Sequence, residues 1–102
     1  EKPFLIAMPG SRHSEIKALF EEIILALKDF NMNVVVPVAP TISEEFLKKH
    51  LPAGVNPVFV PSEYRFEVMK LAKAGVVASG TASLEMAIAG IPHVVVYKVN
   101  PL

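Results

Sequence analysis

The sequence predicts an α/β domain built on a doubly wound parallel sheet. Five short aliphatic runs alternate with helix-forming segments, and no hairpin turn joins one run to the next. Strands that alternate with helices form right-handed crossovers within a parallel sheet. We therefore expect five strands in the order 3-2-1-4-5, with the first and fourth side by side at the topological switch point, where such sheets bind ligands.

Length and charge limit the class of protein. The 102 residues are the size of one domain, and we expect residues 1–102 to form a single one. The 10 basic and 10 acidic side chains balance, so charge does not favour nucleic acid or an anionic membrane as a partner. There is no cysteine, and His13, His50 and His93 lie far apart in the sequence. We therefore expect no metal and no other cofactor.

The first half of the chain carries two predicted strands and two predicted helices. Residues 4–8 form the first strand, which Pro9 and Gly10 end. The second strand covers residues 34–36, with Pro37 at its end or edge because proline has no N–H for the ladder. Residues 41–44, Thr-Ile-Ser-Glu, fit a capping box that opens a short helix. The first helix has one apolar face at helical spacing, formed by Ile16, Leu19, Phe20, Ile23, Ile24 and Leu27.

The second half repeats this alternation. The third strand is predicted at residues 57–60 and ends at Pro61. Ser62 then caps a helix, and the fifth strand covers residues 93–97. The inward side chains of the helix after Ser62 are predicted to be Val68, Met69, Leu71 and Ala72.

Residues 75–90 form the motif around which the rest is organised. The strand at 76–78 lacks polar alternation, which predicts that both of its faces are covered. A turn at 79–81 leads to a helix at 82–89 that Gly90 and Pro92 end. Such a turn presents backbone N–H groups at the positive end of a helix dipole, which suits a phosphate or diphosphate. An ordinary strand-to-helix turn has the same appearance, so both interpretations stand.

Arg12, in the turn after the first strand, is the strongest single candidate for a phosphate-binding residue. A guanidinium beside a glycine turn and a helix start can bind a diphosphate in a bidentate manner. The alternative is a surface pair between Arg12 and Glu15. His13 is either a general acid or base or a solvated turn residue. His93 is expected to be a packed or capping residue, and no Ser-His-acid arrangement or catalytic carboxylate pair is evident.

Two segments together resemble one known family. Residues 5–12 (LIAMPGSR), with a helix starting near Glu15, resemble the first strand and loop of the carboxyl-terminal domain of lipid-A-disaccharide synthases. Residues 78–85 (ASGTASLE), Pro92 and residues 94–102 (VVVYKVNPL) resemble that family's second signature. The second segment alone is typical of the wider set of GT-B glycosyltransferases and UDP-sugar epimerases. The resemblance covers essentially the whole chain.

The resemblance implies one half of a GT-B fold, a Rossmann-like domain that binds a UDP-sugar. The parent protein would be an inverting glycosyltransferase of lipid A biosynthesis that joins UDP-2,3-diacylglucosamine to 2,3-diacylglucosamine 1-phosphate. It would be cytoplasmic and peripheral to the bacterial inner membrane. The amino-terminal acceptor domain, with its catalytic base, and the terminal helices are absent from this chain. We therefore expect donor binding without turnover, and no catalytic residue among these 102.

The resemblance also assigns substrate contacts by position. Glu85 would accept hydrogen bonds from the ribose hydroxyls, and Asn100 would reach the donor from the last loop. Val60 and Pro61 would lie near the uracil. The residues around the diphosphate would be Gly10, Ser11, Arg12, Ser79, Gly80 and Thr81. Two alternatives stay open: half of a UDP-sugar epimerase, which has no acceptor, and a non-catalytic α/β interaction module.

Overall fold

The computed structural model describes residues 3–10, 12–52, 54–78 and 80–96 of the chain. Five parallel strands form one sheet in the order β3-β2-β1-β4-β5, which confirms the predicted fold class and strand order. The strands are β1 (Phe4–Met8), β2 (Asn33–Val38), β3 (Val58–Pro61), β4 (Ala74–Val77) and β5 (His93–Val95).

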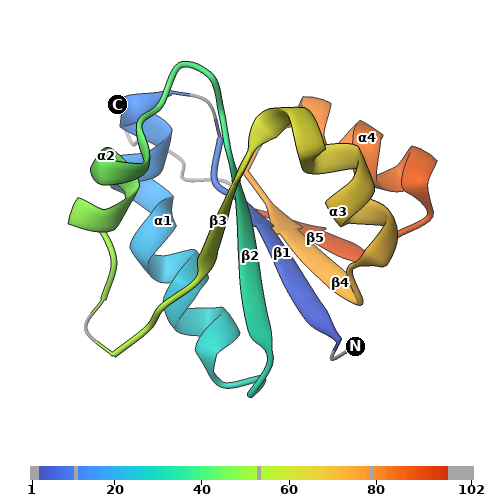
Figure 1. The fold of residues 1–102 in the computed structure, drawn as a ribbon, viewed down its shortest axis with the longest axis horizontal. Coiled ribbons are helices and arrows are strands. Elements are labelled where there is room, and N and C mark those ends of the chain that lie inside the picture. Colours follow the sequence, from blue (N-terminus) through green and yellow to red (C-terminus); the bar gives the residue numbers. More distant parts are fainter. Residues whose placement is uncertain (1–2, 11, 53, 79, 97–102) are drawn as a thin grey trace.

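Helices cover both faces of this sheet (Figure 1). One face carries α1 and α2, and the other carries α3 and α4. The helical segments are α1 (His13–Lys28), α2 (Glu44–Lys49), the 3-10 turn η1 (Ser62–Tyr64), α3 (Arg65–Leu71) and α4 (Gly80–Ala89). This two-layer cover of a parallel sheet is the doubly wound arrangement.

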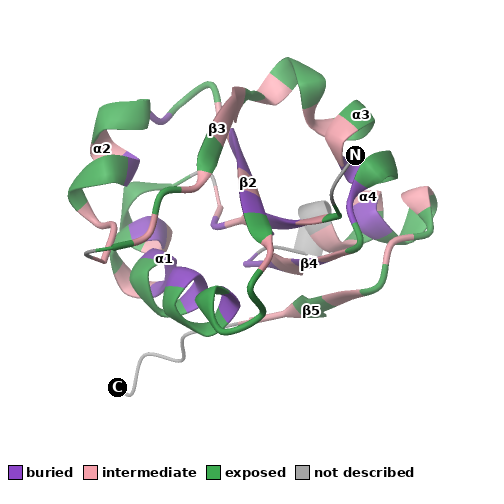
Figure 2. Ribbon diagram, turned by 60° about the horizontal axis from the view of Figure 1, so that its bottom comes forward, coloured by how far each residue is buried: buried purple, intermediate pink, exposed green. Residues whose placement is uncertain are grey.

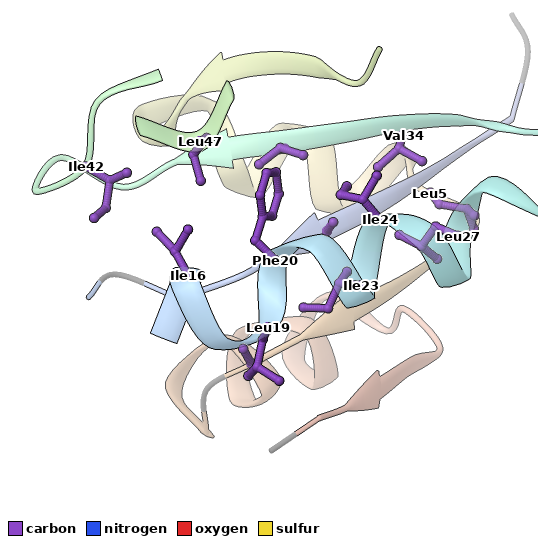
Figure 3. Close-up of a cluster of buried hydrophobic side chains, with 13 residues drawn as sticks. Leu5, Ile16, Leu19, Phe20, Ile23, Ile24, Leu27, Val34, Ile42 and Leu47 are labelled. Carbon is purple, nitrogen blue, oxygen red and sulfur yellow. The ribbon is translucent and has the colours of Figure 1, made fainter. Parts of the chain in front are cut away.

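The larger core lies between α1 and the sheet. The predicted apolar face of α1 is confirmed, since all six of its residues are buried. Figure 2 shows these buried positions on α1 in purple. Phe20 lies near the centre of the cluster and points from α1 toward the sheet (Figure 3). Removing a fully buried aromatic side chain of this kind costs about 3–5 kcal/mol of stability.

The smaller core lies under α3 and α4. Met69 and Met86 pack there against Ile6 and Val77, and all four are fully buried. A Cβ atom at Gly75 would lie 2.7 Å from Ile6 Cγ2 and closer still to the Met86 methyl group. Gly75 therefore lets α4 approach the centre of the sheet closely, and it needs no unusual backbone angle to do so.

The α1 side of β4 and β5 is only partly covered, which corrects the prediction that both faces of the fourth strand are covered. Val76 is half-buried, and 61% of Val94 is exposed. Between α1 and these strands lies an apolar cavity of about 440 Å³, whose walls include Leu19, Ile23 and Val96. The cause is geometric, because α1 lies above β1 and β2 and no described helix follows β5 on that side.

Two predicted boundaries in the first half differ from the structure. β2 runs on to Val38, so Pro37 lies inside the strand, paired with Val60 of β3. The last pair between β2 and β1 is at Val35, so the missing N–H of Pro37 costs no bond to β1. In α2 the capping residue is Ser43, whose Oγ accepts a hydrogen bond from the Phe46 amide at 3.1 Å. The predicted box at residues 41–44 was therefore placed too early.

The second half contains further corrections. β3 begins at Val58 and includes Pro61. Ser62 does not cap a helix, because it starts a 3-10 turn that has no side-chain capping bond. Leu71 was predicted to point inward but is 65% exposed. It lies two residues after buried Met69, about 200° around the helix, so it faces away from the core.

The last helix starts earlier than predicted. α4 begins at Gly80 instead of residue 82, so Gly80 and Thr81 belong to its first turn. Its end is as predicted, because Gly90 follows with φ of +76°. The described part of β5 ends at Val95, and residue 97, predicted to be in this strand, lies outside the described residues.

Candidate functional site

Two loops leave the sheet side by side at its switch point. Met8, the last residue of β1, is paired with Val77, the last residue of β4. The amide of Ala78 donates a hydrogen bond to the carbonyl oxygen of Met8 at 3.0 Å. The chain therefore enters both following segments from adjacent positions, as predicted from the strand order.

The loop after β1 requires glycine for two reasons. Gly10 has φ of +111°, a conformation that residues with a side chain rarely adopt. A Cβ atom at this position would also lie 2.5 Å from Oε1 of Glu15. The carboxylate of Glu15, in the first turn of α1, thus packs directly over the loop. This contact joins two residues five apart in the sequence, and sequence analysis did not predict it.

Arg12 stands in front of α1 with its side chain exposed. Its backbone is extended at the N-cap position, and its side chain makes no capping hydrogen bond. The predicted alternative, a pair with Glu15, does not form, and within the described part of the chain Arg12 has no ion-pair partner. A cation is mildly unfavourable at a helix start. The guanidinium is therefore available to a ligand.

His13 has a packing partner. Its ring meets the Phe46 ring edge-on, with 4.5 Å between centroids. Phe46 in turn contacts His50, with 4.9 Å between centroids. These contacts connect the start of α1 to α2, and they favour a structural role for His13 over that of a general acid or base. His50 is the C-cap residue of α2.

Glu85 does not stand alone on α4. Its Oε1 lies 3.3 Å from Nε of Arg65, the first residue of α3. Nη1 of Arg65 also donates to the carbonyl oxygen of Ser62 at 3.1 Å. The pair therefore connects α4 to the segment that follows β3. Sequence analysis singled out Glu85 but missed Arg65, because 20 residues separate the two and no local spacing predicts the contact.

Val60 and Pro61 line a hollow at the carboxyl ends of β2 and β3. Its volume is about 580 Å³, within the range of small-ligand sites. The apolar wall includes Phe59 and Ile42, and Glu63 adds a carboxylate. Ser62, whose carbonyl oxygen binds Arg65, lines the same hollow. The hollow and the Arg65–Glu85 pair thus share one loop.

Several predicted contacts lie outside what the structure describes. Ser11, Ser79 and Asn100 are outside the described residues, and of Gly80 and Thr81 only the backbone is described. Their predicted roles stay predictions. The backbone of α4 does begin at Gly80, which places the start of this helix directly after the loop that follows β4.

His93 is a packed residue, as expected. Its Nδ1 lies 2.8 Å from the carbonyl oxygen of Ile91, which can only accept, so Nδ1 carries the proton. In the neutral ring, Nε2 then accepts a hydrogen bond from the Ser83 hydroxyl at 2.9 Å. Both ring nitrogens are used in holding α4 against the start of β5.

The described residues meet neither the requirements of a metal site nor those of a membrane-spanning helix. Among the described residues, no group of three or more His, Asp or Glu side chains is arranged to hold a metal ion. In the same part of the chain, every helix is too short or too polar to cross a membrane.

Comparison with known proteins gives a match along the whole chain. The family model for lipid-A-disaccharide synthetase matches residues 1–102. The lipid-A-disaccharide synthase of Myxococcus xanthus is 41% identical, over 98% of this chain and 27% of that relative. Those of Nitrosococcus oceani and Ruegeria pomeroyi are 38% and 37% identical, over 93% and 96% of this chain and 26% and 28% of the relatives. The chain spans about a quarter of the length of these relatives. A family match from the first residue to the last, on a fold of the kind that the resemblance implied, shows that this chain belongs to the lipid-A-disaccharide synthetase family.

Proposed function

We propose that this domain binds the UDP-sugar donor of a lipid A glycosyltransferase in the crevice between the loops after β1 and β4. The observation that carries the proposal is the register of Met8 with Val77, which sets exposed Arg12 and the start of α4 at one edge of the sheet. Membership of the lipid-A-disaccharide synthetase family supports the transferase over the epimerase and the interaction module.

The diphosphate would lie between the two helix starts. Arg12 would bind its oxygens with the planar guanidinium, a charge-assisted and bidentate contact. Backbone N–H groups near Gly10 and at the start of α4 would donate further hydrogen bonds, and the dipoles of α1 and α4 favour an anion there. Ser11, Ser79 and Thr81 are proposed as additional donors. No divalent metal is needed for this arrangement.

The nucleoside would extend toward β3. The hollow beside Val60 and Pro61 has apolar walls that suit the uracil ring. Glu85, on the α4 side, would accept hydrogen bonds from the ribose hydroxyls. Asn100 would contact the donor from the last loop. The sugar would then be transferred, with inversion, to a 2,3-diacylglucosamine 1-phosphate held by a separate acceptor domain that also supplies the base.

In this proposal the present domain binds the donor, and a separate domain binds the acceptor and supplies the base. Glycosyl transfer needs a positioned acceptor and a proton acceptor, and these would belong to the rest of the parent protein. The acylated substrates would lie in the bacterial inner membrane, so the proposed place of action is its cytoplasmic surface.

Titration of the 102-residue chain with UDP tests the proposal. Amide chemical shifts should move near residues 10–14 and 79–85, and they should move equally with and without magnesium. Arg12→Ala should weaken UDP binding by about 1.5–3 kcal/mol, the range for hydrogen bonds to charged groups. Its melting temperature should stay nearly unchanged, because the side chain is exposed.

A matched control separates this effect from loss of general charge. Lys17→Ala removes an exposed cation one turn further along α1, and it should leave UDP affinity nearly unchanged. The uridine affinity of Arg12→Ala should also be unaffected. No shift at millimolar UDP would refute the proposal, and equal losses for UDP and uridine would remove Arg12 from the diphosphate.

A further inference from the structure

The guanidinium of Arg65 is fixed by three different neighbours. Nε contacts Oε1 of Glu85 at 3.3 Å, and Nη1 donates to the carbonyl oxygen of Ser62 at 3.1 Å. The central carbon of the guanidinium also lies 4.6 Å from the centroid of the Phe66 ring. Arg65 and Glu85 are both partly buried, with 34% and 22% of their side chains exposed. The Glu85 carboxylate therefore contacts a guanidinium whose position is already fixed by Ser62 and Phe66.

Stability alone gives this arrangement little reason to exist. Arg65 is the first residue of α3, where the helix dipole disfavours a positive charge. A partly exposed ion pair with a single contact adds little to folding. Its larger effect is on orientation, since it restricts the rotation of Glu85. The contact uses Oε1 and leaves Oε2 outside the ion pair.

The location of the pair links two parts of the crevice. Ser62 belongs to the wall of the hollow beside Val60 and Pro61. Through Ser62 and Glu85, Arg65 joins that wall to α4. A nucleoside whose base enters the hollow would bring its ribose near the carboxylate that Arg65 holds.

We infer that Arg65 is a positioning residue for ribose recognition. It holds the Glu85 carboxylate in the orientation that accepts hydrogen bonds from the ribose hydroxyls, and it keeps this carboxylate in register with the β3–α3 segment. This inference rests on the proposed binding of a UDP-sugar. Arg65 itself contacts no ligand, so its removal alters how well the ribose is distinguished and leaves the diphosphate contacts in place.

The test compares UDP with 2′-deoxy-UDP by calorimetric titration of the 102-residue chain. Arg65→Gln should weaken UDP binding by about three- to tenfold, the effect of having to order a mobile side chain on binding. It should weaken 2′-deoxy-UDP much less, so the ratio of the two affinities falls. Glu85→Gln should lower the same ratio, and the double variant should lower it no further, because the two residues act as one unit.

Two variants complete the design. Lys70→Gln makes the same charge change at an exposed position of α3 and should leave the ratio unchanged. Arg65→Lys keeps the charge but lacks the planar guanidinium that reaches both Ser62 and Glu85. Its ratio of UDP to 2′-deoxy-UDP affinity should therefore lie between those of the unchanged chain and Arg65→Gln. This variant also carries the test if Arg65→Gln fails to fold.

The outcomes separate the two proposals. If the unchanged chain does not bind UDP, the proposed function and this inference both fall. If it binds UDP but the ratio is the same in Arg65→Gln or Arg65→Lys as in the unchanged chain, binding stands and Arg65 is only a structural tie between α3 and α4. A lowered melting temperature with an unchanged ratio leads to that same refutation.

Discussion

Replacing Glu15 with glutamine should strengthen UDP binding. The carboxylate of Glu15 packs over Gly10, inside the loop where we place the diphosphate. A negative charge at this point repels the ligand that the rest of the loop attracts. Glutamine keeps the size and shape of the side chain, so the loop geometry should be retained.

The magnitude follows from the geometry of the contact. A Cβ atom on Gly10 would be 2.5 Å from Oε1 of Glu15, so a phosphate bonded to this backbone would lie about 5 Å from the carboxylate. Two unit charges at about 5 Å interact by ~0.8 kcal/mol in water and ~3 kcal/mol near a protein surface. Because Glu15 is only partly buried and solvent and salt screen its charge, we expect a value near the lower of these limits, about 1 kcal/mol, or about fivefold tighter binding.

Titration at two ionic strengths provides the assay. The gain from Glu15→Gln should shrink as salt is added, because exposed charges are screened. Glu21→Gln, an identical change at an exposed position further along α1, should give a much smaller gain. If Glu15→Gln binds UDP no more tightly than the unchanged chain, or if uridine gains as much as UDP, the diphosphate does not lie in this loop.

Three other predictions follow from the packing and from the proposed division of labour. Gly75→Ala should lower the free energy of unfolding by about 1–3 kcal/mol, measured in urea, because the new methyl group meets Ile6 and Met86. The isolated chain should self-associate through the face of β5 that borders the apolar cavity, so light scattering should detect larger species at high concentration. Val94→Lys should reduce the amount of these larger species, and Leu84→Lys, on the other side of the domain, should not. Supplied with donor and acceptor, the chain should form no disaccharide, and any product would contradict the assignment of the base to another domain.

The parts of the fold that were predicted correctly depend on strong local patterns. The apolar residues of α1 repeat over three turns, so no other element fits them, and all of them are buried. The strand order follows from the alternation of strands and helices and from the right-handed crossovers between strands. Both depend on how many elements there are and very little on where each element begins and ends. Element boundaries were less accurate. Pro37 can stay within β2 because β1 is no longer paired there, and that is a tertiary fact.

The switch point of the sheet was predictable, but the contacts around it were not. The adjacency of the loops after β1 and β4 follows from the topology, whereas the role of Arg12 in phosphate binding stays a prediction. The Arg65–Glu85 pair depends on how α3 packs against α4, which no spacing in the sequence encodes. The contact of Glu15 with Gly10 depends on the left-handed backbone of the loop. The residues in each missed contact come together only when the chain folds, so no local sequence pattern predicts them.

Two arginines stand at helix starts, where the dipole disfavours a cation, and the fold explains only one of them. Arg65 is held by Ser62, Glu85 and the Phe66 ring, which together offset its unfavourable position. Arg12 has no ion pair within the described residues and makes no capping hydrogen bond. A hydrated guanidinium there contributes nothing to α1, and a bound anion would offset its unfavourable position. This asymmetry supports our proposal that the diphosphate lies at the loop after β1 and that the α3–α4 side of the crevice recognises the uncharged part of the ligand.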